Sequence, residues 1–189
     1  MTRVVFSTAT TVDGFIADPT DSLDWLLAVP GAAEAEADFA SFVDRVGVLV
    51  EGSTTYEWVV THEQLLEHPE KWIQFYGERP TFVFTGRERI AVPGADIRFR
   101  SGSVADVWSE ILAVAAGKDV WIVGGGDLAG QFADAGLLDE IVLSVAPVAL
   151  GAGRALLPRR MESDRLSLIG VRQVGQFAEL TYTVDNSRD

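Results

Sequence analysis

Three consecutive glycines, Gly124, Gly125 and Gly126, stand between an apolar run typical of a buried strand and a segment with helical periodicity. Residues without side chains allow the backbone N–H groups of such a turn to touch a bulky anion, and the helix N-terminus adds positive potential. Gly124, Gly126 and Ala129 also fit the spacing G-x-G-x-x-G/A of dinucleotide-binding turns. The alternative is a tight turn that binds nothing.

Two features separate these glycines from an ordinary dinucleotide-binding βαβ unit. The fingerprint normally occupies the first strand-to-helix turn, whereas several predicted strands precede it here. The next predicted strand, residues 140–148, has no acidic residue at its end to hold a ribose. The run is therefore either a packing turn or the pyrophosphate-binding turn of a different fold.

A second turn of the same kind favours a ligand. Gly52 ends another apolar run, and Ser53, Thr54 and Thr55 follow it at the predicted first turn of a helix. Free N–H groups and hydroxyls at a helix start suit an anion, although simple N-capping is the alternative for a single turn. Two such strand–glycine–helix junctions in one sheet favour the binding interpretation.

A third strand end carries Thr85, Gly86 and Arg87, with Arg89 close behind. Arg87 has a plain surface interpretation, and it also suits a further phosphate. In open α/β sheets, ligands bind beyond the carboxyl ends of the strands. The pattern therefore predicts that all three turns lie at one edge of the sheet.

Alternating strand and helix patterns must position these turns. Strands are predicted at residues 3–10, 47–52, 80–86, 119–125 and 140–148. Helices are predicted at residues 33–46, 53–72, 103–117 and 126–136, the last two capped by Ser103 and Asp127. After Pro158, two alternating runs at 165–175 and 176–185 predict an antiparallel hairpin. The expected fold is one α/β domain over residues 1–189, three-layered (α/β/α), with a mixed, mostly parallel central sheet and a C-terminal antiparallel hairpin.

Composition argues against several classes of protein. With 15 Lys and Arg against 28 Asp and Glu, the net charge of −13 disfavours nucleic acid or an anionic membrane as the main partner. The chain has no cysteine, and His62 and His68 are spaced wrongly to chelate one ion from a helix, so no metal site is expected. No run approaches transmembrane length and no signal-peptide pattern is present, so a cytoplasmic protein is expected.

Four segments, in order, resemble the dihydrofolate reductase-like fold, specifically the relatives of the C-terminal reductase domain of riboflavin biosynthesis (RibD C-terminal-like). They are TATTVDGFIAD with DSLDWL, EGSTTYE, WIVGGGDLAGQF and LLDEIVLSVAPVALGAGRALLP. The resemblance spans nearly the whole chain, and its third segment is shared with true dihydrofolate reductases. It implies an NADPH-dependent oxidoreductase with a small-molecule substrate, usually a homodimer in this branch.

The resemblance also implies roles for single residues. Backbone groups of the glycine run would contact the pyrophosphate, Thr54 and Thr55 the cofactor phosphates, and Thr85 with Arg87 the adenosine 2′-phosphate. The cofactor-binding residues implied are Ala9, Ile16, Ala17, Gly52, Ser53, Thr54, Thr55, Thr85, Arg87, Gly124, Gly125, Gly126, Asp127 and Leu128. Of these, Ala9, Ile16 and Ala17 would lie against the nicotinamide. The Asp127 carboxylate suits a helix N-terminus but would repel a diphosphate unless it is turned away.

Departures from the family pattern concern both cofactor choice and substrate. Ser53 stands where many relatives have an arginine that holds the 2′-phosphate. True dihydrofolate reductases carry a substrate-binding carboxylate shortly after the tryptophan that matches Trp25, but here the first acid is Glu34. The D-D-P segment of riboflavin reductases is also missing. The candidate substrate-pocket residues are Asp13, Asp24, Trp25 and Arg154, with Asp13 also suited to a turn.

Two hypotheses follow from these residues. One is a reductase that transfers a hydride from NADPH to a small heterocycle, resembling 5-amino-6-(5-phosphoribosylamino)uracil or a pterin. The alternative is a non-catalytic NADP(H)-binding or sensing protein on the same fold. Turnover separates the two hypotheses, because only a reductase oxidises NADPH when an acceptor is supplied.

Overall fold

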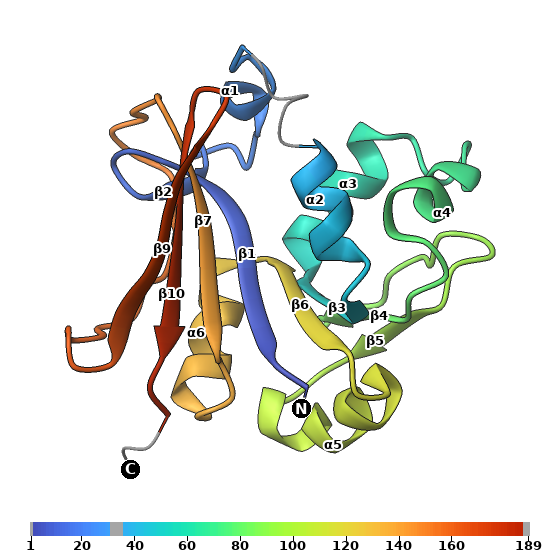
Figure 1. The fold of residues 1–189 in the computed structure, drawn as a ribbon. Coiled ribbons are helices and arrows are strands. Elements are labelled where there is room, and N and C mark those ends of the chain that lie inside the picture. The colour runs from blue at the N-terminus through green and yellow to red at the C-terminus, as the bar shows by residue number, and fades with distance from the viewer. Residues whose placement is uncertain (1, 31–35, 187–189) are drawn as a thin grey trace.

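The computed structural model describes residues 2–30 and 36–186, within which the chain forms one large mixed sheet with helices on both faces (Figure 1). The strands of the large sheet are β1 (Val4–Thr11), β3 (Val46–Gly52), β4 (Thr81–Phe84), β5 (Ile97–Arg100), β6 (Asp119–Gly124), β7 (Glu140–Ala146), β9 (Leu166–Val174) and β10 (Phe177–Val184). A small second sheet pairs β2 (Phe15–Ala17) with β8 (Arg154–Ala155). The helices are α1 (Asp24–Leu27), α2 (Glu36–Val43), α3 (Ser53–His62), α4 (Glu70–Tyr76), α5 (Val104–Ala115) and α6 (Gly126–Asp134).

The strand order of the large sheet is β5-β4-β3-β6-β1-β7-β10-β9. Neighbouring strands from β5 to β7 pair in parallel, while β10 pairs antiparallel with both β7 and β9. The mostly parallel sheet and the C-terminal antiparallel hairpin predicted from the sequence are therefore confirmed. Because β3, β6 and β1 are adjacent and parallel, their carboxyl ends open onto the same edge.

Alternate residues of the central strands pack against helices on opposite faces. Phe6 of β1 and Val50 of β3 belong to the core formed with α5 and α6, which includes Ile111 and Phe132. On the other face, Trp121 of β6 packs against α2, with its ring 5.4 Å from that of Phe42 in an edge-to-face contact. These two cores hold the three layers together, and the strand ends project beyond them.

Strand β5 was not expected from the sequence. Its alternating arginines, Arg98 and Arg100, break the apolar pattern on which the strand predictions rest. Their guanidinium carbons lie 5.5 and 5.6 Å from the centre of the Phe82 ring on the neighbouring strand. Cation–π contact lets these charged side chains cover an apolar ring at the sheet edge, which a hydropathy pattern alone does not capture.

Two helix predictions need correction. The single helix expected at 53–72 is two helices, because the chain leaves helical geometry at Gln64, where φ is 55°, and α4 starts only after Pro69.

Ser103 caps α5 as predicted, within a reciprocal capping box with Asp106. Asp127 is not a cap: Gly125 occupies that position and Asp127 lies in the first turn of α6. Glu34 and the start of the helix predicted at 33–46 lie outside the described residues.

Candidate functional site

The two glycine turns lie side by side at the carboxyl edge of the sheet. Glu51, the residue before Gly52, is the register partner of Gly124 on the adjacent strand. A Cβ atom added to Gly124 would lie 2.8 Å from Thr55 Oγ1, and one added to Gly125 would lie 3.9 Å from the backbone nitrogen of Gly52. The N-termini of α3 and α6 therefore converge on one place, as the two strand–glycine–helix patterns predicted.

Each glycine of the 124–126 run has its own packing reason. Gly124 makes room for Thr55, and Gly125 has φ 98°, a conformation that strains any residue with a side chain. A Cβ on Gly126 would collide with the carbonyl oxygens of Ala155 and Leu156. The fold alone therefore accounts for all three glycines, so the run by itself is not evidence for a ligand.

Gly52 is different, because nothing in the fold requires a glycine there. Its φ of −80° suits any residue, and a Cβ would meet no atom within 4 Å. No side chain caps the helix that follows, so the first N–H groups of α3 stay available beside the hydroxyl residues Ser53, Thr54 and Thr55. The absence of a side chain keeps open space directly in front of these donors.

The Asp127 carboxylate is held by partners on the outer side of α6. It accepts a hydrogen bond from Gln131 Nε2 at 2.9 Å and pairs with Arg159 Nη2 at 3.0 Å, and these contacts lower the pKa of Asp127. Arg159 also binds Asp134 at 2.7 Å and lies against Gly130, where a Cβ would come within 2.8 Å of it. Arg159 therefore offsets the negative charge that would otherwise face an anion at this helix start.

Leu128 is buried in the core between the sheet and α6, with 5% of its surface exposed. Its side chain therefore cannot face a ligand, and only its backbone belongs to the turn. In segment 124–128, therefore, the glycines can offer backbone N–H groups, whereas the Leu128 side chain serves packing.

The third strand end forms a hollow of about 490 Å³ at the carboxyl ends of β4 and β5. Its lining residues are Thr85, Gly86, Arg87, Glu88, Arg89, Phe99, Arg100 and Ser101. Like Gly52, Gly86 would place a Cβ in open space. The lining holds three arginines and one acid, Glu88, and two of the arginines are paired, Arg89 with Glu57 and Arg100 with Glu110. The phosphate contact near Arg87 stays a prediction.

The arginines of this hollow differ in how they are held. Arg87 is exposed, and its backbone nitrogen donates to Thr85 Oγ1 at 3.1 Å. The side chain of Arg89 is only 14% exposed: it forms an ion pair with Glu57 of α3, Nη1 donates to the Glu88 carbonyl at 3.0 Å, and Nη2 is buried without a partner. The sequence points to Arg87, whereas the guanidinium that is held in place is that of Arg89, which is largely buried.

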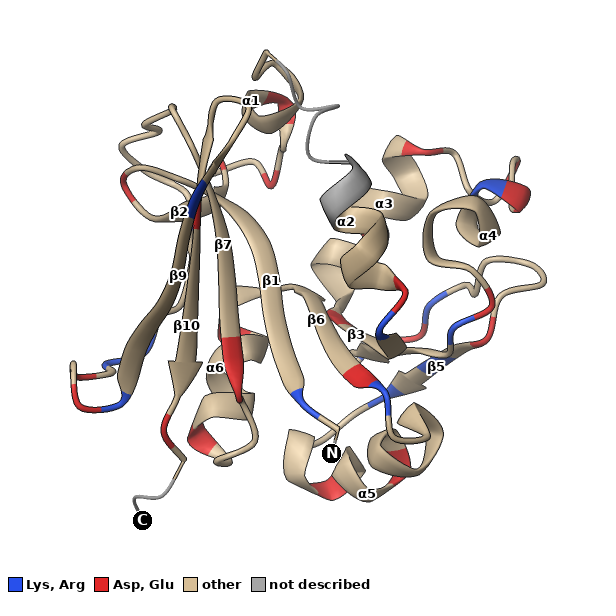
Figure 2. Cartoon of the chain, in the orientation of Figure 1, with Lys and Arg blue, Asp and Glu red and all other residues tan. Residues whose placement is uncertain are grey.

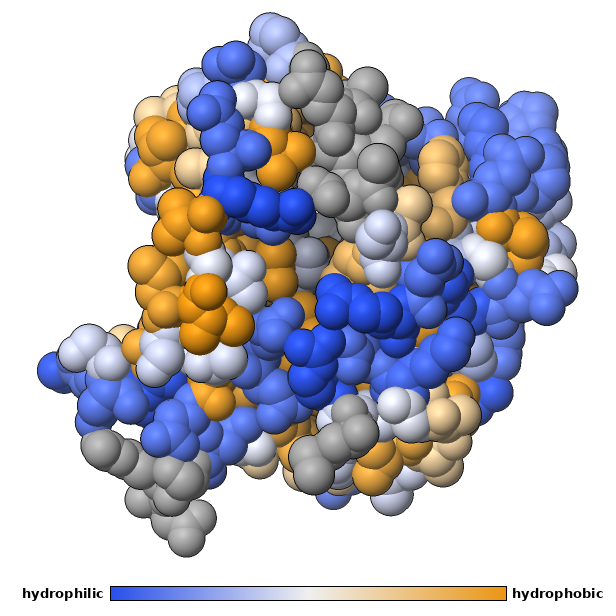
Figure 3. Space-filling model, in the orientation of Figure 1, coloured by the Kyte–Doolittle hydropathy of each residue, from blue (hydrophilic) through white to orange (hydrophobic). Residues whose placement is uncertain are grey.

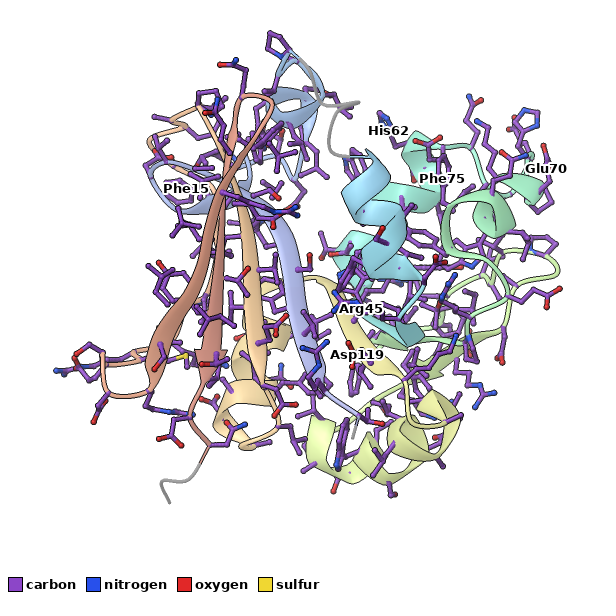
Figure 4. The ribbon with its side chains drawn as sticks, viewed as in Figure 1. Phe15, Arg45, His62, Glu70, Phe75 and Asp119 are labelled. Carbon is purple, nitrogen blue, oxygen red and sulfur yellow. The ribbon has the colours of Figure 1, made fainter. Side chains whose placement is uncertain are left out.

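Ala9, Ile16 and Ala17 lie where β1 turns into β2, all half-buried. Thr10 Oγ1 donates to the Phe15 carbonyl at 3.1 Å, and Ala17 pairs with Arg154 of β8. The three residues are thus held on a fixed segment beyond the carboxyl end of β1. Phe15, labelled in Figure 4, lies at this end of the molecule, whereas Asp119 lies at the opposite end of the strands, at the start of β6.

Asp13 has a structural task. Its carboxylate accepts hydrogen bonds from Thr11 Oγ1 at 2.5 Å and from the backbone nitrogens of Leu150 and Gly151 at 3.0 and 2.7 Å. These bonds, led by the one from Thr11, lower the pKa of Asp13. An ionised carboxylate with this many donors joins the β1–β2 turn to the loop at 150–151, and it is poorly suited to give up a proton.

The other substrate-pocket candidates lie near the same end of the molecule. Arg154 binds Asp21 through two hydrogen bonds of 2.5 and 2.9 Å, so an anionic substrate group would have to compete with that carboxylate. Asp24 is exposed in the first turn of α1. Trp25 packs with Val29 and Phe177, and its Nε1 is buried without a hydrogen-bond partner among the described residues.

The described residues contain neither a metal-binding cluster nor a membrane-spanning helix. Between residues 2 and 186, leaving out the undescribed segment 31–35, no three His, Asp or Glu side chains come together in a metal-binding arrangement. In the same part of the chain, no helix combines the length and apolar character needed to span a bilayer.

Comparison with known proteins identifies the family. The sequence profile of the RibD C-terminal domain matches residues 43–178, which include the turns at Gly52, Thr85 and Gly124. The chain belongs to the RibD C-terminal domain family. The resemblance inferred from the four sequence segments is thereby confirmed.

Relatives of this RibD C-terminal domain protein span its full length. YwjB of Bacillus subtilis strain 168, an uncharacterized protein, is 28% identical over 180 residues, which are 95% of this chain and 97% of YwjB. A crystal structure from Shewanella sp. PV-4, described as a riboflavin biosynthesis protein, matches 98% of this chain and 99% of its own with 26% identity and a TM-score of 0.77.

The dihydrofolate reductase of Enterococcus faecalis, solved in complex with NADP(H), matches 97% of this chain and 96% of its own with 15% identity and a TM-score of 0.60. At that identity the likeness shows a common fold. The dihydrofolate reductase-like fold expected from the sequence is therefore also confirmed.

Proposed function

We propose that the protein is an NADPH-dependent reductase that transfers a hydride to a small heterocyclic substrate. The observation that carries the proposal is the open space at Gly52, which the fold leaves empty in front of two converging helix N-termini. Such a place suits the diphosphate of a dinucleotide, because free backbone N–H groups and two helix dipoles act on it together. Membership of a reductase family supports the same function.

The residues would hold the cofactor at three places along the carboxyl edge. The turns at Gly52 and Gly125 would hold the diphosphate, Arg87 and Arg89 the adenosine 2′-phosphate, and Ala9 with the 15–17 segment the nicotinamide. When bound, the cofactor supplies the hydride. The protein aligns it with the substrate and excludes water.

The substrate would lie on the Trp25 side of the nicotinamide position. Trp25 Nε1 is buried and has no hydrogen-bond partner among the described residues, which favours an acceptor there, such as a ring nitrogen, a carbonyl or a bound water. A compound like 5-amino-6-(5-phosphoribosylamino)uracil or a pterin has such groups. Asp13 is an anchor in this structure, so the proton needed by the reduced ring would come from Asp24 or from water.

Titration of the intrinsic tryptophan fluorescence with NADPH and with NADH tests the cofactor site. Gly52→Asp places a carboxylate in the open space without backbone strain, and we expect at least a hundredfold loss of NADPH affinity, with the melting temperature unchanged. Ser109→Asp on the exposed face of α5 is the matched control, because it adds the same charge away from the site. Equal affinities in the two variants would remove the cofactor assignment.

A non-catalytic NADP(H)-binding or sensing protein is the second candidate. It is favoured by the engagement of Asp13 and Arg154 in structural contacts, which leaves neither free for substrate. The rate of NADPH oxidation with a panel of pyrimidine and pterin acceptors separates the two functions. A sensor binds the cofactor and leaves it unoxidised with every acceptor.

The homodimer implied by the family stays a prediction. Its expected interface is the edge strand β9, where Leu168, Ile169 and Val171 are more than half exposed. Figure 3 places hydrophobic side chains together over this side of the molecule. Sedimentation velocity of the wild type and of Ile169→Lys tests the interface; a wild-type monomer would contradict it.

A further inference from the structure

Glu51 is a buried acid that none of the roles above uses. It is the last residue of β3 before Gly52, and its register partners are Val83 on β4 and Gly124 on β6. Only 1% of its surface is exposed. Since side chains alternate along a strand, Glu51 shares the face of Leu49, which is the face covered by α2, α3 and α4.

Among the described residues, none places a positive charge close to Glu51. The titratable groups close enough to interact with it electrostatically are Tyr56 of α3 and Tyr76 of α4, and Tyr76 also faces Glu63. The strands on either side contribute Val83 and Gly124, which are uncharged. Among the described residues no group donates a hydrogen bond to Glu51, and its Oε1 is fully buried.

A carboxylate in such a place is strongly disfavoured, because an unpaired charge loses its hydration on burial. The carboxyl group therefore stays neutral, and desolvation raises the pKa of Glu51 to about 8. To ionise, it must draw water in beneath α3 or move toward the surface. Its own backbone is held between two strands, and the first turn of α3 follows it directly in the chain.

We infer that Glu51 is a positioning residue for the phosphate-binding turn: its neutral carboxyl lets α3 pack down on β3, and its ionisation displaces Ser53–Thr55 and weakens dinucleotide binding. The inference rests on the proposed cofactor site. Repulsion acts in the same direction, since an ionised Glu51 would place a negative charge one residue from the turn that faces the diphosphate.

The test is the dissociation constant for NADPH between about pH 7 and about pH 9.5, compared for the wild type and Glu51→Gln. Glutamine keeps the size of the side chain and cannot ionise. Above about pH 8, the wild type should lose affinity by up to about tenfold per pH unit, while Glu51→Gln should hold its neutral-pH affinity. Glu67→Gln, an exposed acid after α3, is the matched control and should follow the wild type.

A parallel profile in the wild type and Glu51→Gln would overturn the inference, as would a loss of affinity in Glu51→Gln at every pH. Tyr56 and Tyr76 do not titrate in this range, because burial raises the pKa of both, that of Tyr56 to about 12.

Unfolding without cofactor separates failure of this inference from failure of the proposed function. Because the folded pKa of Glu51 is raised, the unfolded chain releases this proton first, so the stability it provides falls from about pH 5 to about pH 8 and then levels off. The difference in melting temperature between Glu51→Gln and the wild type should widen over that range. If this difference in melting temperature does not change with pH, Glu51 does not behave as a buried neutral acid and the inference is overturned. Absence of NADPH binding at every pH contradicts the proposed function alone.

Discussion

The two ends of the parallel strands are built in opposite ways. At the amino ends, Arg3 binds Asp119 at 2.5 Å and Glu140 at 2.9 Å, and the Val4 nitrogen donates to Asp139 at 2.8 Å. Figure 2 shows these charges gathered at the starts of β1, β6 and β7. Here each charged side chain has a partner within the chain.

At the carboxyl ends, polar groups are left without partners. Gly52 leaves open space in front of the α3 N-terminus. Among the described residues, Trp25, Glu51 and Arg89 each keep a buried polar atom with no hydrogen bond, whereas near the amino ends Asn186 Oδ1 is such an atom. An unsatisfied buried polar group destabilises a fold by about 1–3 kcal/mol, which a ligand can recover on binding. The amino ends therefore hold the sheet together through paired charges, while the carboxyl ends keep the open space at Gly52 and more of the unpaired polar atoms, and it is there that we propose cofactor binding.

Among the substitutions that test this contrast, the one with the largest expected effect lies at the amino ends. Arg3→Met should lower the free energy of unfolding by roughly 2–3 kcal/mol in urea, because Asp119, only 7% exposed, would lose its partner. The value is below the range for fully buried pairs because the Arg3 side chain is 38% exposed. Arg160→Met, which removes a 90% exposed arginine, is the control and should change stability little. If Arg3→Met also weakened NADPH binding tenfold, the two edges would not be independent.

The next effect concerns the hollow at the carboxyl ends. Arg89→Met should weaken NADPH binding roughly tenfold, about 1.5 kcal/mol, and leave NADH binding unchanged, because a guanidinium that is already held in place loses less freedom on binding a phosphate than a mobile one. Arg87→Met is the matched comparison and should weaken NADPH less, since Arg87 is exposed and screened by solvent. Calorimetric titration measures both. A larger loss in Arg87→Met would restore the assignment made from sequence.

The smallest effect is expected for the ion pair between Arg159 and Asp127, close to the open edge. Arg159→Met should release Asp127 toward the cofactor and weaken NADPH and NADH alike by roughly threefold, because both carry the diphosphate. Adding Asp127→Asn should restore the affinity. The loss should shrink at high salt, because Asp127 is exposed. A salt-independent loss, or one limited to NADPH, would show that Arg159 acts in another way.

Much of the site could be predicted because it depends on local sequence. Strand, glycine and helix follow one another at both turns, and parallel strands bring their carboxyl ends to one edge. The sequence does not show that the Arg89 side chain is held in place. Its ion-pair partner, Glu57, lies on a different element, and an ion pair between elements leaves no periodic signal. The sequence also does not show that Glu51 is buried, since an acid at the end of an apolar strand is expected to be exposed unless a helix covers it.

The sequence by itself determined the five apolar strands, the mostly parallel sheet with its C-terminal hairpin and the place of the strand–glycine–helix turns, because periodicity and turn residues act over a few neighbours. Only the tertiary structure decided which glycines serve packing and which leaves space for a ligand. It also decided that Asp13 and Arg154 are held by partners, and that Glu51 is buried without one. Partners and burial come from residues distant in the chain, so they exist only once the layers have packed.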